Sequence, residues 1–277
     1  MTKAPRRTLD VSRSTSCSPG ISVLLTERAD LLAGRRIGVL ANASGVLPDL
    51  TSSADALLRT ADVRALFAPE HGLYDAAAEG AEIGHDVHRS GVPIYSLYGA
   101  NLAPLPAQFA GLDAIVCDIQ DVGCRFYTYI WTLIKLMEVA AQLGVAVIVA
   151  DRPNPLGGAL IEGPGVESPY RTLVGLHDVP IRHGLTLGEL ARLVNAKTRL
   201  GCDLTVVPCM GWRRAELWAA TGLLFRSLDF ASMYGTNDVK SSEFIASTPV
   251  GEVCRVKDRE IWISTSVQDR RDSPAPL

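Results

Sequence analysis

The stretch DAIVCDIQDVGCRFYTYIWTLIKLMEVAAQLGVAVIVA, residues 113–150, decides the fold of this chain. Residues 113–119 and 145–150 are short, continuous apolar runs, which are typical of strands buried on both faces of a parallel sheet. Residues 127–143 between them have helical periodicity, and Gly144 is a common residue at a helix end. The stretch therefore predicts a strand–helix–strand unit.

The same alternation of strand and helix continues on both sides of this unit. Thr186 and Glu189 have the spacing of a capping box, which marks the start of one helix. Strand–helix alternation predicts an α/β fold with a mostly parallel sheet and helices on both faces. The further predicted strands are residues 36–42, 63–68, 92–97 and 203–207, and the further predicted helices are 52–59 and 187–200.

Composition excludes several classes of protein. The chain has 277 residues, of which 47% are hydrophobic, and its 27 basic and 30 acidic residues give a net charge of −3, so nucleic-acid partners are not expected. No apolar run reaches the ~18 residues of a membrane span. The six cysteines are too sparse for a disulfide scaffold, and they include no C-x-x-C pair, which argues against a zinc site. Residues 1–21 lack the apolar core of a signal peptide, and we expect a cytoplasmic protein.

Polar residues follow four of the predicted strands. Ligands of open parallel sheets bind beyond the carboxyl ends of the strands, so these residues are candidates for a site. His183, which lies in a loop before the capped helix, is a further candidate. The others are Asn42 after the first strand, Glu70 and His71 after the second, Asp118, Gln120, Asp121, Arg125 and Tyr127 after the fourth, and Asp151, Arg152 and Asn154 after the fifth.

Each candidate also has a structural interpretation. Glu70 could cap a helix, and Asp118 and Asp121 could bind backbone amides at a helix start. Arg125 and Arg152 could form structural ion pairs with these aspartates, and His183 could serve packing alone. Tyr127, Tyr129 and Trp131 have the spacing of a helix face and fit a core as well as a sugar platform, whereas His85 and His88 are expected at the surface.

Motifs for nucleotide binding and serine-hydrolase chemistry are missing from the sequence. There is no G-x-x-x-x-G-K-[ST] phosphate loop and no G-x-S-x-G nucleophile elbow. Gly157 and Gly158 follow a proline-rich turn, not a strand that opens into a helix, and so make a poor dinucleotide fingerprint. We expect no nucleotide cofactor.

Five segments carry a resemblance to a known family. These are FAPEHG (67–72), GVPIYSLYG (91–99), DIQDVGCRFYTY (118–129), DRPNPLGG (151–158) and RHGLTLGELA (182–191). In this order they closely resemble signature segments of the DUF1343 family, which includes the NamZ-like exo-β-N-acetylmuramidases of glycoside hydrolase family 171. The resemblance runs from about residue 34 to residue 212.

The resemblance implies a fold and an activity. It implies a Rossmann-like N-terminal domain, a smaller C-terminal domain, and an active site in the cleft between them without metal or nucleotide cofactors. The substrate would be a peptidoglycan fragment of the MurNAc-GlcNAc type, from which the enzyme removes N-acetylmuramic acid at the non-reducing end during cell-wall recycling. We expect a flexible tail over residues 1–20, the Rossmann-like domain over 21–215, and a remnant or divergent C-terminal segment over 216–277, because after the matched stretch only residues 221–225 still look like the family.

Roles for the candidate residues follow from this implied chemistry. Glycosidases usually need one carboxylic acid and a second carboxylate as base or nucleophile. Glu70 is the expected acid, with Asp118 or Asp121 as its partner, in either an inverting or a retaining mechanism. Arg125 or Arg152 would bind the lactyl carboxylate. The remaining expected substrate contacts are Asn42, His71, Gln120, Tyr127, Asp151, Asn154 and His183.

Two other hypotheses stay open. In the first, the chain is a truncated, catalytically impaired member of the family that keeps only sugar binding or has no activity. In the second, the chain is a different hydrolase that places Glu70, Asp118 and His183 around a metal ion, and it loses activity with a chelator. The oligomeric state is left open by the sequence.

Overall fold

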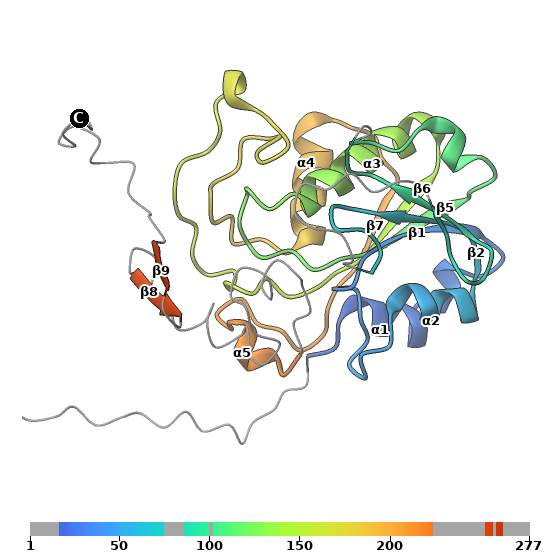
Figure 1. Ribbon diagram of the computed structural model, residues 1–277, viewed down its shortest axis with the longest axis horizontal. Helices are drawn as coiled ribbons and strands as arrows, with labels where there is room; N and C mark the ends of the chain where they lie inside the picture. Colours follow the sequence, from blue (N-terminus) through green and yellow to red (C-terminus); the bar gives the residue numbers. More distant parts are fainter. Residues whose placement is uncertain (1–16, 75–85, 100–101, 224–252, 257–258, 263–277) are drawn as a thin grey trace, which may run out of the picture.

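The computed structural model describes residues 17–74, 86–99, 102–223, 253–256 and 259–262, and its centre is one mixed sheet (Figure 1). Its strands are β1 (Arg36–Ala41), β2 (Asp62–Ala68), β3 (Asp86–Val87), β4 (Pro93–Ser96), β5 (Ala114–Asp118), β6 (Ala146–Ala150) and β7 (Leu204–Val207). They lie in the order β3-β4-β2-β1-β5-β6-β7. All neighbours are parallel except β3, which pairs antiparallel with β4. The predicted α/β fold is therefore confirmed.

Helices cover both faces of the sheet, as predicted. Helices α1 and α2 lie on one face, and α3 and α4 lie on the other (Figure 1). The helices are α1 (Gly20–Thr26), α2 (Ser53–Thr60), α3 (Tyr129–Leu143), α4 (Leu187–Thr198) and α5 (Trp218–Thr221), with short 3-10 turns at Ala29–Leu31, Pro106–Phe109 and Ser168–Tyr170. A separate antiparallel pair is formed by β8 (Val253–Val256) and β9 (Arg259–Trp262).

The core consists of two apolar layers, one on each side of the sheet. In β5, Ile115 and Cys117 belong to the layer under α3 and α4, whereas Ala114 and Val116 belong to the layer under α1 and α2. Side chains of a strand alternate between faces, and both faces are covered here. This is why the strand sequences are continuous apolar runs, and why Trp131 of α3 has no exposed surface.

Residues 17–20, which belong to the expected N-terminal tail, pack against the domain. Cys17 is buried, and the backbone of Ser18 exchanges hydrogen bonds with Met210. Helix α1 follows this segment and was not predicted. Residues 1–16 lie outside the described part of the chain.

The segment expected to be a remnant or divergent, from residue 216 onward, begins with helix α5. Trp218 of α5 is buried, and its N–H donates to the carbonyl of Pro155 at 3.0 Å. Apart from β8 and β9, residues 224–277 lie outside the described part of the chain. Among the described residues, no helix has the length and apolar character needed to cross a lipid bilayer.

Candidate active site

The carboxyl ends of four strands meet at one edge of the sheet. Because β1, β2, β5 and β6 are parallel neighbours, their last residues lie side by side. The structure brings to this edge the polar residues that follow them, among them Asn42, Glu70, Asp118 and Asp151. We call this edge the rim.

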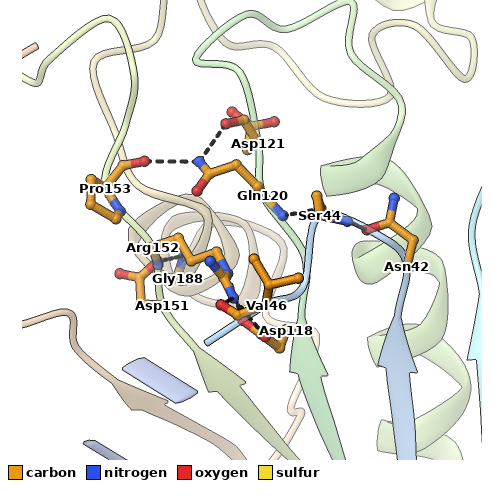
Figure 2. Close-up of polar contacts among 10 residues, drawn as sticks. All are labelled: Asn42, Ser44, Val46, Asp118, Gln120, Asp121, Asp151, Arg152, Pro153 and Gly188. Atoms are coloured by element: carbon orange, nitrogen blue, oxygen red, sulfur yellow. Dashed lines mark hydrogen bonds and ion pairs between the residues drawn. The ribbon is translucent and has the colours of Figure 1, made fainter. Parts of the chain in front are cut away.

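Asp118 and Arg152 form a buried, two-pronged ion pair. Arg152 Nε donates to Asp118 Oδ1 at 2.7 Å, and Nη2 donates to Oδ2 at 2.8 Å and to the carbonyl of Val46 at 2.7 Å (Figure 2). Asp118 has no exposed surface, and Arg152 is 3% exposed. The pair joins the ends of β5 and β6 to the loop after β1.

Asp151 anchors the start of helix α4. Its carboxylate accepts from Thr186 Oγ1 at 2.6 Å, from the N–H of Gly188 at 2.9 Å and from the N–H of Arg152 at 3.0 Å. A Cβ on Gly188 would lie 2.9 Å from the Asp151 carboxyl carbon, so this close approach needs glycine. Burial raises the pKa of Asp151 to about 6, although the three hydrogen bonds act in the opposite direction.

The predicted capping box is present at the same helix end. The N–H of Glu189 donates to Thr186 Oγ1, and the carboxylate of Glu189 accepts from the N–H of Thr186. Together with Asp151, these contacts fix the loop that precedes α4 against the end of β6. His183 lies in that loop.

A chain of hydrogen bonds runs along the rim from β1 to β6. Asn42 Oδ1 accepts from the N–H and the hydroxyl of Ser44, and Ser44 Oγ accepts from the N–H of Gln120 at 3.0 Å. Gln120 Nε2 then donates to the carbonyls of Asp121 and Pro153, at 2.7 and 2.9 Å (Figure 2). The side chains of Asn42 and Gln120 therefore hold fixed positions.

Asp121 and His183 form a second buried pair. His183 Nε2 lies 3.4 Å from Asp121 Oδ2, and both residues are less than 5% exposed. The N–H of Leu185 donates to His183 Nδ1, so the neutral ring carries its proton on Nε2, which faces the carboxylate. Asp121 Oδ2 also accepts from the N–H of Gly123 at 2.7 Å.

Several buried polar atoms of the rim have no hydrogen-bond partner within the described residues. Asn42 Nδ2 is a donor, and Gln120 Oε1 and Asp121 Oδ1 are acceptors. Leaving such an atom unpaired costs about 1–3 kcal/mol. Three of them at one edge of the sheet are a feature of ligand sites, where the ligand supplies the partners.

Glu70 differs from the other rim carboxylates because it is only half-buried. Its Oε2 accepts from the hydroxyl of Thr128 at 2.9 Å. The next residue, His71, is buried and has a left-handed backbone with φ of 69°. A non-glycine residue in this conformation is strained, and such strain is concentrated at functional sites.

The other predicted contacts organise the loops beside the rim. Arg125 Nη1 donates to the carbonyls of Pro164 and Val179, both at 2.7 Å. The buried side chain of Asn154 donates to the carbonyl of Leu185 and accepts from the N–H of Leu156. Tyr127 is half-buried, with its ring 4.5 Å from that of Tyr129, which belongs to the core together with Trp131.

The surface position expected for His88 is wrong. The side chain is buried. Its Nδ1 contacts Ser90 Oγ at 2.8 Å, and its Nε2 lies 3.6 Å from Asp55 Oδ1. His85 lies outside the described residues. Within the described ranges, no three His, Cys, Asp or Glu side chains are grouped as a metal site would need.

Sequence reasoning missed two residues of the site. Thr128 directly precedes α3, where a threonine is normally a helix cap, yet its side chain makes no capping bond and holds Glu70 instead. Ser44 bridges Asn42 and Gln120. The contacts from Thr128 to Glu70 and from Ser44 to Gln120 join residues that are more than 50 positions apart in the sequence. No local sequence pattern could have identified them.

Comparisons with known proteins now bear on this geometry. Residues 37–229 match the family model described as exo-beta-N-acetylmuramidase NamZ, N-terminal. The chain belongs to the NamZ family. The DUF1343 resemblance is thereby confirmed.

Relatives of this NamZ-family chain include a curated protein and two solved structures. Peptidoglycan beta-N-acetylmuramidase NamZ of Bacillus subtilis is 45% identical over 209 residues, which are 74% of this chain and 50% of that protein. Two DUF1343 family proteins of Bacteroides fragilis superpose with TM-scores of 0.71 and 0.63 at 39% and 33% identity, covering 77% and 74% of this chain and 55% of each structure. The chain thus spans about half the length of the relatives that it matches.

Proposed function

We propose that this chain binds the terminal N-acetylmuramic acid of peptidoglycan fragments at the rim and releases it by carboxylate acid/base catalysis. Membership of the NamZ family supports the substrate class, since the Bacillus subtilis relative is named a peptidoglycan beta-N-acetylmuramidase. The single observation that supports this mechanism most is that Glu70 is half-buried, whereas Asp118, Asp121 and Asp151 are buried.

Glu70 is the proposed general acid. A glycosidase acid has to reach the glycosidic oxygen, and Glu70 is half-buried while Asp118, Asp121 and Asp151 are less than 5% exposed. The neutral hydroxyl of Thr128 orients the carboxyl group without introducing a positive charge beside it. A carboxyl group held in this way is able to donate a proton to a leaving oxygen.

Asp121 is the proposed second carboxylate, in preference to Asp118. Both oxygens of Asp118 are bound by the buried guanidinium of Arg152, which supports a structural role for this pair. Asp121 retains one unpaired oxygen, and His183 lies beside the other. Its carboxylate is therefore the one with capacity for a water molecule or a sugar atom.

The remaining rim atoms match the functional groups of an amino sugar. Hydroxyl and acetamido groups both donate and accept hydrogen bonds, and the unpaired atoms of Asn42 and Gln120 are one donor and one acceptor. For the lactyl carboxylate, half-buried Arg125, whose side-chain hydrogen bonds to the described residues use Nη1 alone, is better placed than Arg152, whose buried guanidinium is paired with Asp118. An arginine fork suits such a carboxylate.

The test uses the full 277-residue chain and the disaccharide MurNAc-GlcNAc. Release of N-acetylmuramic acid is followed by chromatography, and binding to the same protein is measured by titration calorimetry. We expect both release and binding. Binding without release would support the alternative, a family member that only binds the sugar, and absence of both would overturn the proposed function.

A further inference from the structure

The carboxylate of Asp121 and the imidazole of His183 come from two loops that are joined through their backbones. An isolated antiparallel bridge joins Cys124 to Arg182. Asp121 lies three residues before this bridge on one loop, and His183 directly follows it on the other. The bridge brings the two side chains together, with His183 Nε2 at 3.4 Å from Asp121 Oδ2.

The imidazole of His183 is held in one orientation. Its Nδ1 accepts from the N–H of Leu185 at 3.2 Å. The carbonyls of the next two residues are bound as well, because Arg214 Nη1 donates to Gly184 at 3.0 Å and Asn154 Nδ2 donates to Leu185 at 2.8 Å. Since Nδ1 is an acceptor, the neutral ring carries its proton on Nε2, the nitrogen that lies beside the carboxylate.

The small exposed surface of this pair belongs to Asp121. The side chain of His183 has no exposed surface, whereas that of Asp121 retains 5%. Asp121 Oδ2 accepts from the N–H of Gly123 at 2.7 Å and faces His183, while Oδ1 has no hydrogen-bond partner within the described residues. A sugar or a water molecule therefore reaches the pair through Asp121 and not through His183.

We propose that His183 is a positioning residue for Asp121 in the muramidase reaction. Its Nε2–H and the N–H of Gly123 hold Oδ2, so that Oδ1 stays free for the water molecule or sugar atom on which Asp121 acts. This role rests on the proposed function, and it takes the place of the direct sugar contact that the resemblance implies for His183. Holding a reacting group in its productive geometry accelerates a reaction, and a misplacement of about 1 Å costs about 100-fold in rate.

The first experiment measures the contact without any assay of activity. The full chain is isotopically labelled at the ring nitrogens of its five histidines, and long-range proton–nitrogen correlation spectra at mildly alkaline pH report which nitrogen of each ring carries the proton. His183→Gln identifies the His183 signals by their loss. We expect the Nε2–H tautomer for His183, and we expect Asp121→Asn to shift its Nε2 signal. An Nδ1–H tautomer, or an Nε2 signal that Asp121→Asn leaves in place, would overturn the proposal.

The second experiment compares two substitutions of His183. His183→Leu fills a similar volume but removes the Nε2 donor, and it should lower kcat for release from MurNAc-GlcNAc about 100-fold with little change in KM. His183→Gln keeps an N–H group near the place of Nε2 and should recover at least about tenfold of that loss. The matched control is His177→Gln, in the same loop before α4, where the half-buried histidine has an Nε2 without a hydrogen-bond partner among the described residues. This control should keep full activity.

The outcomes separate positioning from the other roles of a buried histidine. A higher KM at unchanged kcat in His183→Leu would indicate a direct sugar contact and overturn the positioning role. Equal losses of kcat in His183→Leu and His183→Gln, with equal falls of the urea midpoint, would indicate packing and overturn it as well. Absence of release by the unsubstituted chain would overturn the proposed function, whereas wild-type kcat in His183→Leu would overturn this inference alone.

Discussion

Replacing Asp118 by asparagine tests whether the rim contains a structural ion pair beneath a separate catalytic group. The substituted side chain would keep its shape but would present an amide nitrogen or a single neutral oxygen to Arg152. Asp118 accepts two charged hydrogen bonds from Arg152, at 2.7 and 2.8 Å, and the two residues are 0% and 3% exposed. Removing one partner of such a pair lowers the free energy of unfolding by about 3–5 kcal/mol, because the other charge stays buried without compensation.

Urea unfolding followed by tryptophan fluorescence measures this loss. Asp118→Asn should lower the unfolding midpoint with little change in the slope. The matched control is Asp113→Asn, which breaks the pair with Arg36 at 2.8 Å on the surface, where solvent screens the charges and the loss should be far smaller. The double change Asp118→Leu with Arg152→Met should recover much of the stability.

One result would refute this reasoning. If Asp118→Asn unfolded at the same urea concentration as Asp113→Asn while release of N-acetylmuramic acid disappeared, the carboxylate would be acting in the reaction and not in the scaffold. The buried pair would then be wrongly interpreted, and Asp118 would replace Asp121 as the partner of Glu70.

Three further changes give distinct outcomes. The pKa of about 6 for folded Asp151 exceeds the ordinary value of 3.8, so the folded protein binds the extra proton and the free energy of unfolding should fall by up to about 3 kcal/mol as pH rises from 4 to 6. Asp151→Asn should flatten that slope in urea titrations, whereas a control change at exposed Asp203 should not. Thr128→Val should lower kcat for release about tenfold, because Glu70 loses its hydrogen bond. The stability should not fall as it would for a missing helix cap. Thr128→Ser should retain activity, and equal activity of the two variants would contradict this role. Asp121→Asn should lower release at least about 100-fold with binding retained, and normal turnover would remove Asp121 from the mechanism.

The fold was predictable because a strand that is covered on both faces buries every residue, so its sequence is apolar throughout. In β5 and β6 both faces are covered, so the apolar runs and the glycine after α3 identify the central unit without any knowledge of distant contacts. The two-residue strand β3 was missed, since its pairing depends on the turn from His88 to Val92 and not on its composition. Helix α1 was missed because its seven residues, GISVLLT, are too few to show a helical period.

The position of the polar residues at one edge of the sheet was predictable, but their contacts were not. Parallel strands place Asn42, Glu70, Asp118 and Asp151 at one edge, and this follows from the pattern alone. Whether a carboxylate meets a guanidinium, a hydroxyl or a helix start depends on loops that are distant in the sequence. Thr128 illustrates the limit, because its position before a helix indicates a cap while its hydroxyl contacts Glu70.

The central claim is that Glu70 is the acid of a muramidase site, and one measurement tests it most directly. Release of N-acetylmuramic acid from MurNAc-GlcNAc is compared between the wild-type chain, Glu70→Gln and the control Glu167→Gln, in which an exposed glutamate is replaced. Glu70→Gln should lose at least about 100-fold in kcat while binding and unfolding stay unchanged, and Glu167→Gln should retain full activity. Near-normal release by Glu70→Gln would contradict the account.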